Sequence, residues 1–412
     1  MTVDGEPLTI LNLVPHLKMV KSNLFRQFFN SEKAGGLILI LCTVVSLMLS
    51  NSAAGRGYIH FWHTDAFVQI RYIRFPFRIE EWINDGLMTV FFLMVGLEIE
   101  REILSGELSK FRNAVLPVVA AIGGMIVPAA IHFIFNHGTA EQAGIGIPMA
   151  TDIAFSLGVL SLLGNRVPLS LKIFLTALAI IDDLGAVIII AIFYTQSFSF
   201  FYLGLSLALF GILLLFNRLR VFSLWVYLPA GIVLWYLMYR SGVHPTLSGI
   251  LLAFAIPFRK EIKNPPSAIL QHALHKPVNF FIIPLFALAN TAIHLPKGWH
   301  TELLSHNSLG SSLGLIFGKP LGIVGFSLLA VMLGIGGLPK GMNRTNLLGM
   351  GFLAGIGFTM SIFISNLAFI SNPDEIQSSK VAVLLASLIA AISGWLLLKR
   401  SIRENPVKPL SA

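Results

Sequence analysis

Two adjacent carboxylates stand in the middle of a long apolar run, where charged residues are rare. Asp182 and Asp183 occur in the stretch LTALAIIDDLGAVIII. Carboxylate oxygens are hard ligands that bind small cations, and a proton on the same oxygens removes the charge that holds the cation. The pair therefore predicts a site at which a small cation and protons compete.

Two further charges lie inside apolar runs. Asp152 follows Pro148 and Thr151 in IGIPMATDIAF, and Lys319 lies well inside SLGLIFGKPLGIVGFSLL. In an apolar surrounding, an ammonium group needs a carboxylate or backbone carbonyls close by. Lys319 is then either a fixed counter-charge to an aspartate or a group that releases and regains a proton. The residues alone leave both roles open.

The composition tells us what kind of element carries these charges. The chain has 412 residues, of which 55% are apolar and only 12% charged, whereas soluble domains carry about 25% charged residues. Most apolar runs reach the length that crosses a hydrocarbon layer. We therefore expect a membrane protein. The net charge of +9 is spread between the apolar runs rather than gathered in a basic helix, which argues against nucleic-acid binding.

The apolar runs predict an all-α polytopic fold. They do not alternate apolar and polar residues as barrel strands do, and lipid tolerates no unpaired backbone. We expect about twelve transmembrane helices, near 34–51, 82–104, 114–135, 149–163, 169–195, 200–217, 223–238, 242–257, 267–292, 308–335, 346–370 and 378–399.

The basic residues predict the orientation of these helices. If the amino terminus is cytoplasmic, most of the 29 Lys and Arg residues fall on the cytoplasmic side, as membrane proteins generally arrange them. We therefore expect a single membrane domain over 1–412, with a cytoplasmic segment 1–33 and a cytoplasmic tail 400–412. Cys42 is the only cysteine, so the chain has no internal disulfide and no thiolate metal site.

The first outer loop, residues 52–80, differs from the other loops. Between residues 66 and 79 it mixes aromatic, β-branched and basic residues in rough alternation, which predicts a small β-hairpin. An exposed hairpin edge can pair with a second copy of the chain, although a loop packed on its own protein fits the pattern equally well. Asp85, just beyond this loop, reads as an interfacial charge.

Two helices are expected to be interrupted. The fourth contains Pro148 and Thr151 beside Asp152, and the eleventh contains four closely spaced glycines, Gly349, Gly351, Gly355 and Gly357. Broken helices at matching places in two inverted repeats mark the binding sites of many transporters. Spans 3–5 and 10–12 would be these repeats. Asp152 would offset the positive amino ends of the half-helices, and Lys319 their negative carboxyl ends.

Six segments of the chain resemble the NhaA family of bacterial Na⁺/H⁺ antiporters. They are ATDIAFSLGVLSLLGNRVPLSLKIFLTALAIIDDLGAVIIIAIFYT, SGVHPTLSG, FGKPLGI, GIGFTMSIFIS, NDGLMTVFFLMVGLEIERE and AAIGGMIVPA. The resemblance runs from about residue 34 to 400. It implies an electrogenic exchanger of sodium for protons that also accepts lithium, serves pH and sodium homeostasis and needs no cofactor. It also implies a location in the bacterial inner membrane and a homodimer formed through the 66–79 hairpin.

The resemblance also implies roles for individual residues. Asp183 would be the firmer sodium ligand, and Asp182 would share the cation and pair alternately with Lys319. Thr151 and Asp152 would lie where the interrupted helices cross. Two carboxylates would leave room for more than one proton per cation.

The control of activity by pH is less well defined by the resemblance. The residues implied in the pH response are Glu98, Arg101, Glu102, His244, His272 and His275. Glu100 stands where the family usually has a basic residue, and Gln271 stands where it has an acidic one. The two histidines after Gln271 fit surface residues at a helix end equally well. These departures predict a displaced pH optimum.

Two other functions would also use buried aspartates. A sodium-coupled symporter would need a pocket for an organic solute, which the sequence does not obviously contain. An intramembrane aspartyl protease would need a Gly-x-Gly-Asp on one helix and a single Asp on another. Here the acids are adjacent, Ile180 and Ile181 precede them, and a buried lysine accompanies them.

Overall fold

The computed structural model describes residues 2–3, 6–7, 32–70, 73–75, 77–194, 198–295, 298–339 and 341–404. Most of the expected segment 1–33 and residues 405–412 of the expected tail lie outside the described residues. Among those described, the strands form two short antiparallel pairs: β1 (Thr2–Val3) with β2 (Glu6–Pro7), and β3 (Val68–Ile70) with β4 (Ile73–Phe75). In the second pair Val68 lies opposite Phe75.

All other elements are helical. In chain order they are α2 (Glu32–Ser50), α3 (Gly55–Trp62), α4 (Ile79–Glu81), η1 (Trp82–Leu87), α5 (Met88–Leu104), η2 (Glu107–Ser109), α6 (Phe111–Asn136), η3 (Ala140–Met149), α7 (Ile153–Ser161), η4 (Gly164–Arg166), α8 (Leu169–Phe193), α9 (Phe200–Arg218), α10 (Leu224–Ser241), α11 (Leu247–Ala255), α12 (Pro266–Pro277), η5 (Val278–Ile282), α13 (Ile283–Asn290), α14 (Trp299–Glu302), α15 (His306–Leu313), η6 (Gly314–Gly318), α16 (Lys319–Met332), α17 (Arg344–Ala354), α18 (Phe358–Ala368) and α19 (Pro373–Glu404). Here η2, η3 and η4 are 3₁₀ helices, and η1, η5 and η6 are π-helical turns.

Five helices in the described part of the chain are long and apolar enough to cross a membrane: Asn113–Asn136, Leu169–Phe193, Phe200–Arg218, His306–Met332 and Pro373–Ile402. Three helix pairs pass the same test but are bent at a short break. The bend is 119° between α2 and α3, 41° between η3 and α7, and 44° between α17 and α18. The prediction of a helical, polytopic membrane protein is confirmed in this form, whereas the count of twelve stays a prediction.

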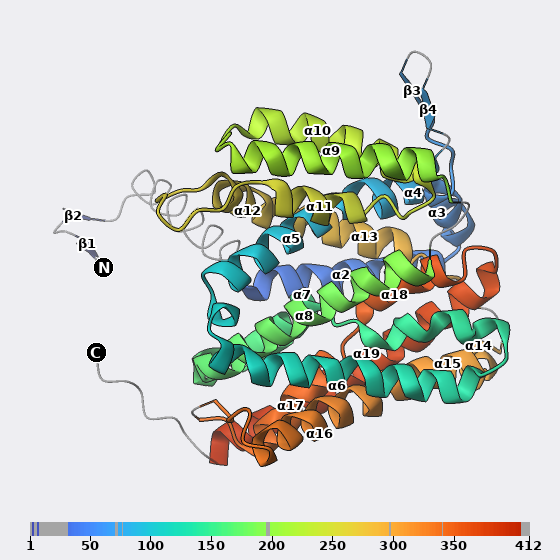
Figure 1. The fold of residues 1–412 in the computed structure, drawn as a ribbon. Coiled ribbons are helices and arrows are strands. Elements are labelled where there is room, and N and C mark those ends of the chain that lie inside the picture. The colour runs from blue at the N-terminus through green and yellow to red at the C-terminus, as the bar shows by residue number, and fades with distance from the viewer. Residues whose placement is uncertain are drawn as a thin grey trace.

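The helices lie side by side in a bundle with two distinct ends (Figure 1). Helices α9 and α10 pack together along one edge, α16 and α17 lie at the opposite edge, and α6, α7, α8 and α18 lie between. We call the end where α2 begins and α19 terminates the terminal face. We call the opposite end, where β3 and β4 project beside α3 and α4, the hairpin face.

Close contact between two backbones positions Lys319. A Cβ atom added at Gly322 of α16 would lie 2.1 Å from the carbonyl oxygen of Gly123 in α6. Small residues let membrane helices approach to this degree, because packing rather than the hydrophobic effect holds them together in lipid. The contact lies one helical turn after Lys319, so it fixes the position of that lysine along the axis of the bundle.

The expected start of the fourth span was wrong. Sequence reasoning placed the span at 149–163, but η3 begins at Ala140, nine residues earlier. Glu141 and Gln142 make the start of this half polar, and its glycines and Pro148 disfavour an α-helix. The chain forms a 3₁₀ helix there instead, which leaves a full half-helix on each side of the break at 150–152.

Candidate functional site

The two helix breaks meet in the middle of the bundle. The Asp152 backbone N–H donates to the Ile356 carbonyl at 2.7 Å. The Ser156 hydroxyl, in α7, donates to the Leu353 carbonyl in α17 at 2.7 Å. The Ser361 hydroxyl, in α18, donates to the Ile147 carbonyl in η3 at 2.6 Å. Each broken helix thus donates to carbonyls near the break of the other, where a break in an apolar interior needs additional partners.

Asp152 joins the amino ends of two half-helices. Its Oδ1 accepts the backbone N–H of Phe155 at 2.8 Å, which caps α7. Its Oδ2 accepts the backbone N–H of Thr359 at 3.1 Å and the Thr359 hydroxyl at 2.5 Å, at the start of α18. The carboxylate is buried, with 2% of the residue exposed. Its negative charge therefore lies where two helix dipoles present positive ends.

Lys319 and Asp182 form an ion pair that is closed to solvent. The Lys319 Nζ lies 2.8 Å from Asp182 Oδ2, and both side chains are 0% exposed. The same ammonium donates to the carbonyl of Met149, the last residue of η3. The lysine is therefore placed at the negative, carboxyl end of a half-helix, the counterpart of Asp152 at the amino ends.

Thr151 connects this ion pair to the second broken helix. Its hydroxyl lies 2.7 Å from Asp182 Oδ2 and 2.8 Å from the carbonyl oxygen of Ala354, the last residue of α17. A hydroxyl has a single proton, so it can donate fully to only one of these two acceptors at a time. Its hydrogen bond can therefore follow the protonation of Asp182.

Asp183 is buried like its neighbour but is not paired like it. Only 1% of the residue is exposed, and its Oδ1 has no hydrogen-bond partner among the described residues. Adjacent helical residues point about 100° apart, so Asp183 turns away from the side on which Asp182 meets Lys319. A buried carboxylate oxygen without a donor is unfavourable, and either a proton or a bound cation relieves it.

The residues implied in pH response do not gather at this crossing. Arg101 Nη2 lies 3.1 Å from Glu102 Oε1 and 3.7 Å from Glu98 Oε1, at the end of α5. His244 Nε2 lies 3.3 Å from Asp85 Oδ1, just before α11. Asp85, expected as an interfacial charge, is thus part of an ion pair when His244 is protonated.

The other two histidines lie elsewhere again. His272 and His275 are exposed on α12, which packs against α5. Glu100, the residue out of the family pattern, has a buried Oε2 without a hydrogen-bond partner among the described residues. The structure therefore places the six residues on α5, on α12 and just before α11, and their role stays a prediction.

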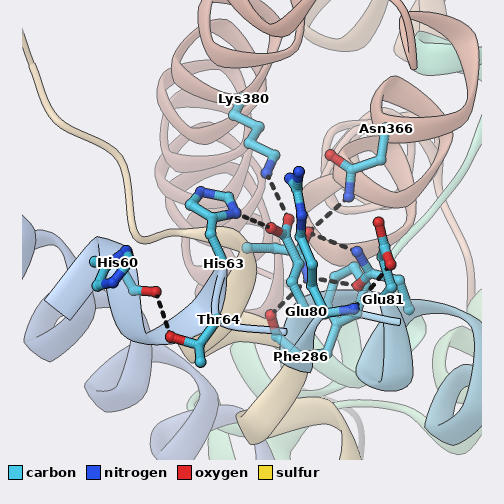
Figure 2. A network of polar contacts seen from close by, with 11 residues as sticks. His60, His63, Thr64, Glu80, Glu81, Phe286, Asn366 and Lys380 are labelled. Carbon is cyan, nitrogen blue, oxygen red and sulfur yellow. Dashed lines mark hydrogen bonds and ion pairs between the residues drawn. The ribbon is translucent and has the colours of Figure 1, made fainter. Parts of the chain in front are cut away.

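A second charged cluster at the hairpin face was not anticipated (Figure 2). Glu80 Oε1 lies 3.7 Å from Lys380 Nζ, and Glu80 Oε2 lies 3.1 Å from His63 Nδ1. Beside it, Asn366 of α18 donates to the Asn290 side chain of α13 at 2.6 Å. We call Glu80, His63 and Lys380 the hairpin-face cluster; it joins α3, α4 and α19.

Sequence reasoning also missed the serines and Thr359 at the crossing. Ser156 lies four residues after Asp152, and Ser361 lies four residues after Gly357. This shared spacing from the two breaks is the signal that would have revealed them. The carbonyl partners Met149 and Ala354 carry no signal in their side chains.

Comparison with known proteins gives a consistent result. A family model described as Na⁺/H⁺ antiporter 1 matches residues 26–398. Three relatives, each named Na(+)/H(+) antiporter NhaA, match almost their whole length. That of Dechloromonas aromatica is 57% identical and covers 91% of this chain and 95% of its own. That of Flavobacterium psychrophilum is 54% identical (94% and 98%), and that of Cytophaga hutchinsonii is 52% identical (94% and 97%).

Proposed function

This chain belongs to the Na⁺/H⁺ antiporter 1 family, and from that premise we propose that it exchanges sodium for protons across a bacterial inner membrane, with Asp182 and Asp183 as the transporting groups. It is a secondary transporter and not an enzyme, and it works without a cofactor. The observation that carries the site is the pair of adjacent, buried carboxylates, of which only Asp182 is paired with Lys319, while each has an oxygen without a donor among the described residues.

The exchange follows from competition at Asp183. When its carboxylate is ionised, its oxygens offer hard ligands to Na⁺ or Li⁺. When a proton binds, the charge is lost and the cation leaves. Exposing the same site alternately to the two sides of the membrane then couples proton entry to sodium exit, without covalent chemistry.

Lys319 and Thr151 give Asp182 a separate part in this cycle. While Lys319 is charged, it favours the ionised form of Asp182 through the 2.8 Å contact. If Asp182 turns to the cation, the ammonium keeps only the Met149 carbonyl as a described partner. If Asp182 is protonated, it can donate to Thr151, which then donates to the Ala354 carbonyl. A second titrating group of this kind permits more than one proton per sodium, which makes the exchange electrogenic.

The arrangement of the crossing supports a pair of inverted repeats. One repeat would comprise α6, the broken pair η3–α7 and α8, and the other α15–α16, the broken pair α17–α18 and α19. The two broken pairs bend by similar angles, 41° and 44°, and exchange reciprocal serine hydrogen bonds. We include in this proposal twelve spans in one membrane domain, with both termini cytoplasmic, so that the terminal face is the cytoplasmic one.

Two finer features belong to the same proposal. The pair β3–β4 projects from the bundle and offers an edge through which two copies would form a homodimer. The residues that would set the pH response are those at the far end of α5 and on α12, together with His244. With Glu100 and Gln271 out of the family pattern, the pH optimum would be displaced.

The decisive experiment measures exchange in everted vesicles from cells that lack other antiporters. Addition of Na⁺ or Li⁺ should collapse a preformed ΔpH when the protein is present. Asp183→Asn should abolish this response. Asp374→Asn, the same change at an exposed position at the start of α19, should leave it intact and serves as the matched control.

Three outcomes would count against the proposal. No response to either cation from mildly acid to strongly alkaline pH would exclude antiport. Normal exchange by Asp183→Asn would leave antiport in place but remove Asp183 from the site. Sodium-driven uptake of an organic solute without proton movement would favour a symporter, a function that no separate observation supports.

A further inference from the structure

A cavity of about 550 Å³ lies at the terminal face, away from the aspartates. It is lined by Leu162, Leu163, Arg166, Trp395, Lys399 and Ile402. These residues come from the end of α7, from η4 and from the last turns of α19, which lie against one another. The Ser387 hydroxyl of α19 accepts the backbone N–H of Phe358 at the helix crossing. Lys399 lies twelve residues further along the same helix. At the rise of an α-helix this distance is about 18 Å, so the cavity is a separate site.

The cavity wall carries uncompensated positive charge. Arg166 and Lys399 are both exposed, and neither forms an ion pair with a carboxylate in the part of the chain that the structure describes. Among the described residues, no acidic side chain lines the cavity. The Lys399 Nζ lies 4.3 Å from the centre of the Trp395 ring, which holds the ammonium at the wall. Two cations with an aromatic face between apolar walls are suited to an anion that also has an apolar part.

An unused donor lies in the same wall. Trp395 Nε1 is buried and has no hydrogen-bond partner among the described residues. A buried N–H without an acceptor is unfavourable, and this one belongs to a residue of the cavity.

An apolar face of α19 leads to the cavity. Leu388, Ile389, Ile392 and Leu396 are 54%, 47%, 51% and 53% exposed. Their spacing places them on one side of the helix, within a segment apolar enough to span a membrane. Leu162 at the cavity wall is 50% exposed as well. Acyl chains can therefore lie along α19 below the two cations, an arrangement that a free inorganic anion would not use.

We propose that Arg166, Lys399 and Trp395 bind the head group of an anionic phospholipid whose acyl chains lie along the exposed face of α19. The phosphate lies between the two cations, and the Trp395 ring holds Lys399 in place. In the orientation that we propose above, this lipid belongs to the cytoplasmic leaflet, whose negative surface attracts basic residues at the membrane boundary. The lipid connects η4, after the first broken helix, to the end of α19.

The test measures lipid retention by the full-length protein in detergent, using native mass spectrometry with added phosphatidylglycerol or phosphatidylcholine. The wild type should retain phosphatidylglycerol preferentially. The double variant Arg166→Gln/Lys399→Gln should bind it about 30-fold more weakly, because each basic residue near anionic lipid contributes roughly a fivefold effect. Lys110→Gln/Arg344→Gln removes two exposed charges elsewhere on the same face and should retain the lipid.

Three results would overturn the proposal. Equal retention by the wild type and the Arg166→Gln/Lys399→Gln variant would remove the site. Equal loss in the control variant would reduce the effect to net charge. Displacement of phosphatidylglycerol by millimolar inorganic phosphate would make the site one for a free anion. None of these readouts involves transport, so failure of the lipid site and failure of antiport are distinguishable.

Discussion

Two lysine–carboxylate pairs hold this bundle together, and they differ chiefly in their access to water. At the helix crossing, Lys319 and Asp182 are 2.8 Å apart with both side chains 0% exposed. In the hairpin-face cluster, Lys380 and Glu80 are 3.7 Å apart with side chains 10% and 16% exposed, and His63 shares the carboxylate. Both pairs join helices that are distant in the sequence.

The difference between the pairs explains why one suits transport and the other suits structure. The Glu80 and Lys380 side chains keep 16% and 10% of their surface exposed, so water can replace part of a lost partner in the hairpin-face cluster. At the crossing, a lost partner must be replaced by a proton or by another cation. The Lys319–Asp182 pair, which we call the dry pair, is therefore coupled to ion binding. The Lys380–Glu80 pair, which we call the wet pair, has the same chemical groups but contributes only to stability.

The largest effect is expected from breaking the dry pair. Asp182→Asn leaves the Lys319 ammonium buried without a counter-charge, which should lower the free energy of unfolding by about 3 to 5 kcal/mol. Denaturant titration in mixed micelles would measure it, and exchange should be lost. The double variant Asp182→Asn/Lys319→Met removes both charges and should regain most of the stability but none of the exchange. If the double variant is no more stable than the single one, the buried charge is not the cause.

The next effect concerns the carboxylate that joins the two half-helices. Asp152→Asn keeps one acceptor oxygen, places an NH2 donor where the other oxygen stood, and removes the negative charge from two helix amino ends. The expected loss is about 1 to 2 kcal/mol. Asp152→Ala should cost more, because it also leaves the Phe155 and Thr359 N–H groups without an acceptor. Equal stability of the two variants would show that the remaining acceptor contributes nothing, and wild-type stability of Asp152→Asn would show that the charge has no part in holding the crossing.

A smaller pair of effects tests whether the two breaks are equivalent. Ser156→Ala and Ser361→Ala each remove one hydroxyl from a carbonyl of the opposite helix, and each should cost about 1 kcal/mol. The two losses should agree because the contacts are reciprocal. Unfolding in micelles would measure both. A large cost at one position only would mean that a single break carries the crossing.

The smallest effect is expected at the wet pair, Glu80 with Lys380. Glu80 precedes the expected second span, 82–104. Burial alone would raise the pKa of Glu80, but the charges of Lys380 and His63 together lower it below its ordinary value of 4.5. The stabilisation by this ionised carboxylate is therefore complete above about pH 4.5 and is lost as the pH falls through the lowered pKa. Glu80→Gln should cost less than about 1 kcal/mol at pH 7.

This cost should shrink as the pH falls through the lowered pKa of Glu80, because the wild type then loses the charge that Glu80→Gln lacks at every pH. Unfolding curves at pH 7 and pH 3 would measure the convergence. Glu302→Gln, at an exposed position on α14, is the control and should show no such trend. A cost that persists at pH 3 would assign the effect to packing rather than charge.

Much of the fold could be predicted because lipid permits few alternatives. An uninterrupted apolar run must form a helix there, so the expected span 169–195 agrees closely with α8 at Leu169–Phe193. The half-helix η3 was missed because its first residues are polar and its glycines disfavour regular helix. The π-helical turns η5 and η6 were also missed, since the residues that form them are ordinary helix residues.

The candidate site was predictable only in part. Asp152, Asp182, Asp183 and Lys319 stand out because charge is costly inside apolar runs, and that cost can be read from one sequence. Which atoms they meet depends on how two breaks approach in space, so the Met149 and Ala354 carbonyls could not be foreseen. Glu80 and Lys380 lie 300 positions apart, each near a helix end where charge is ordinary, and their pairing left no signal.

The 3₁₀ winding of η3 has a mechanical consequence for the site. A 3₁₀ helix rises about 2.0 Å per residue and an α-helix about 1.5 Å, so η3, with ten residues, would shorten by about 5 Å on rewinding. Its far end, at Ala140, would not have to move for the carbonyl of Met149 to withdraw from Lys319. Rewinding of η3 would thus move its Met149 end along the helix axis by about one helical turn, next to the ion pair. This distance is comparable with a register shift.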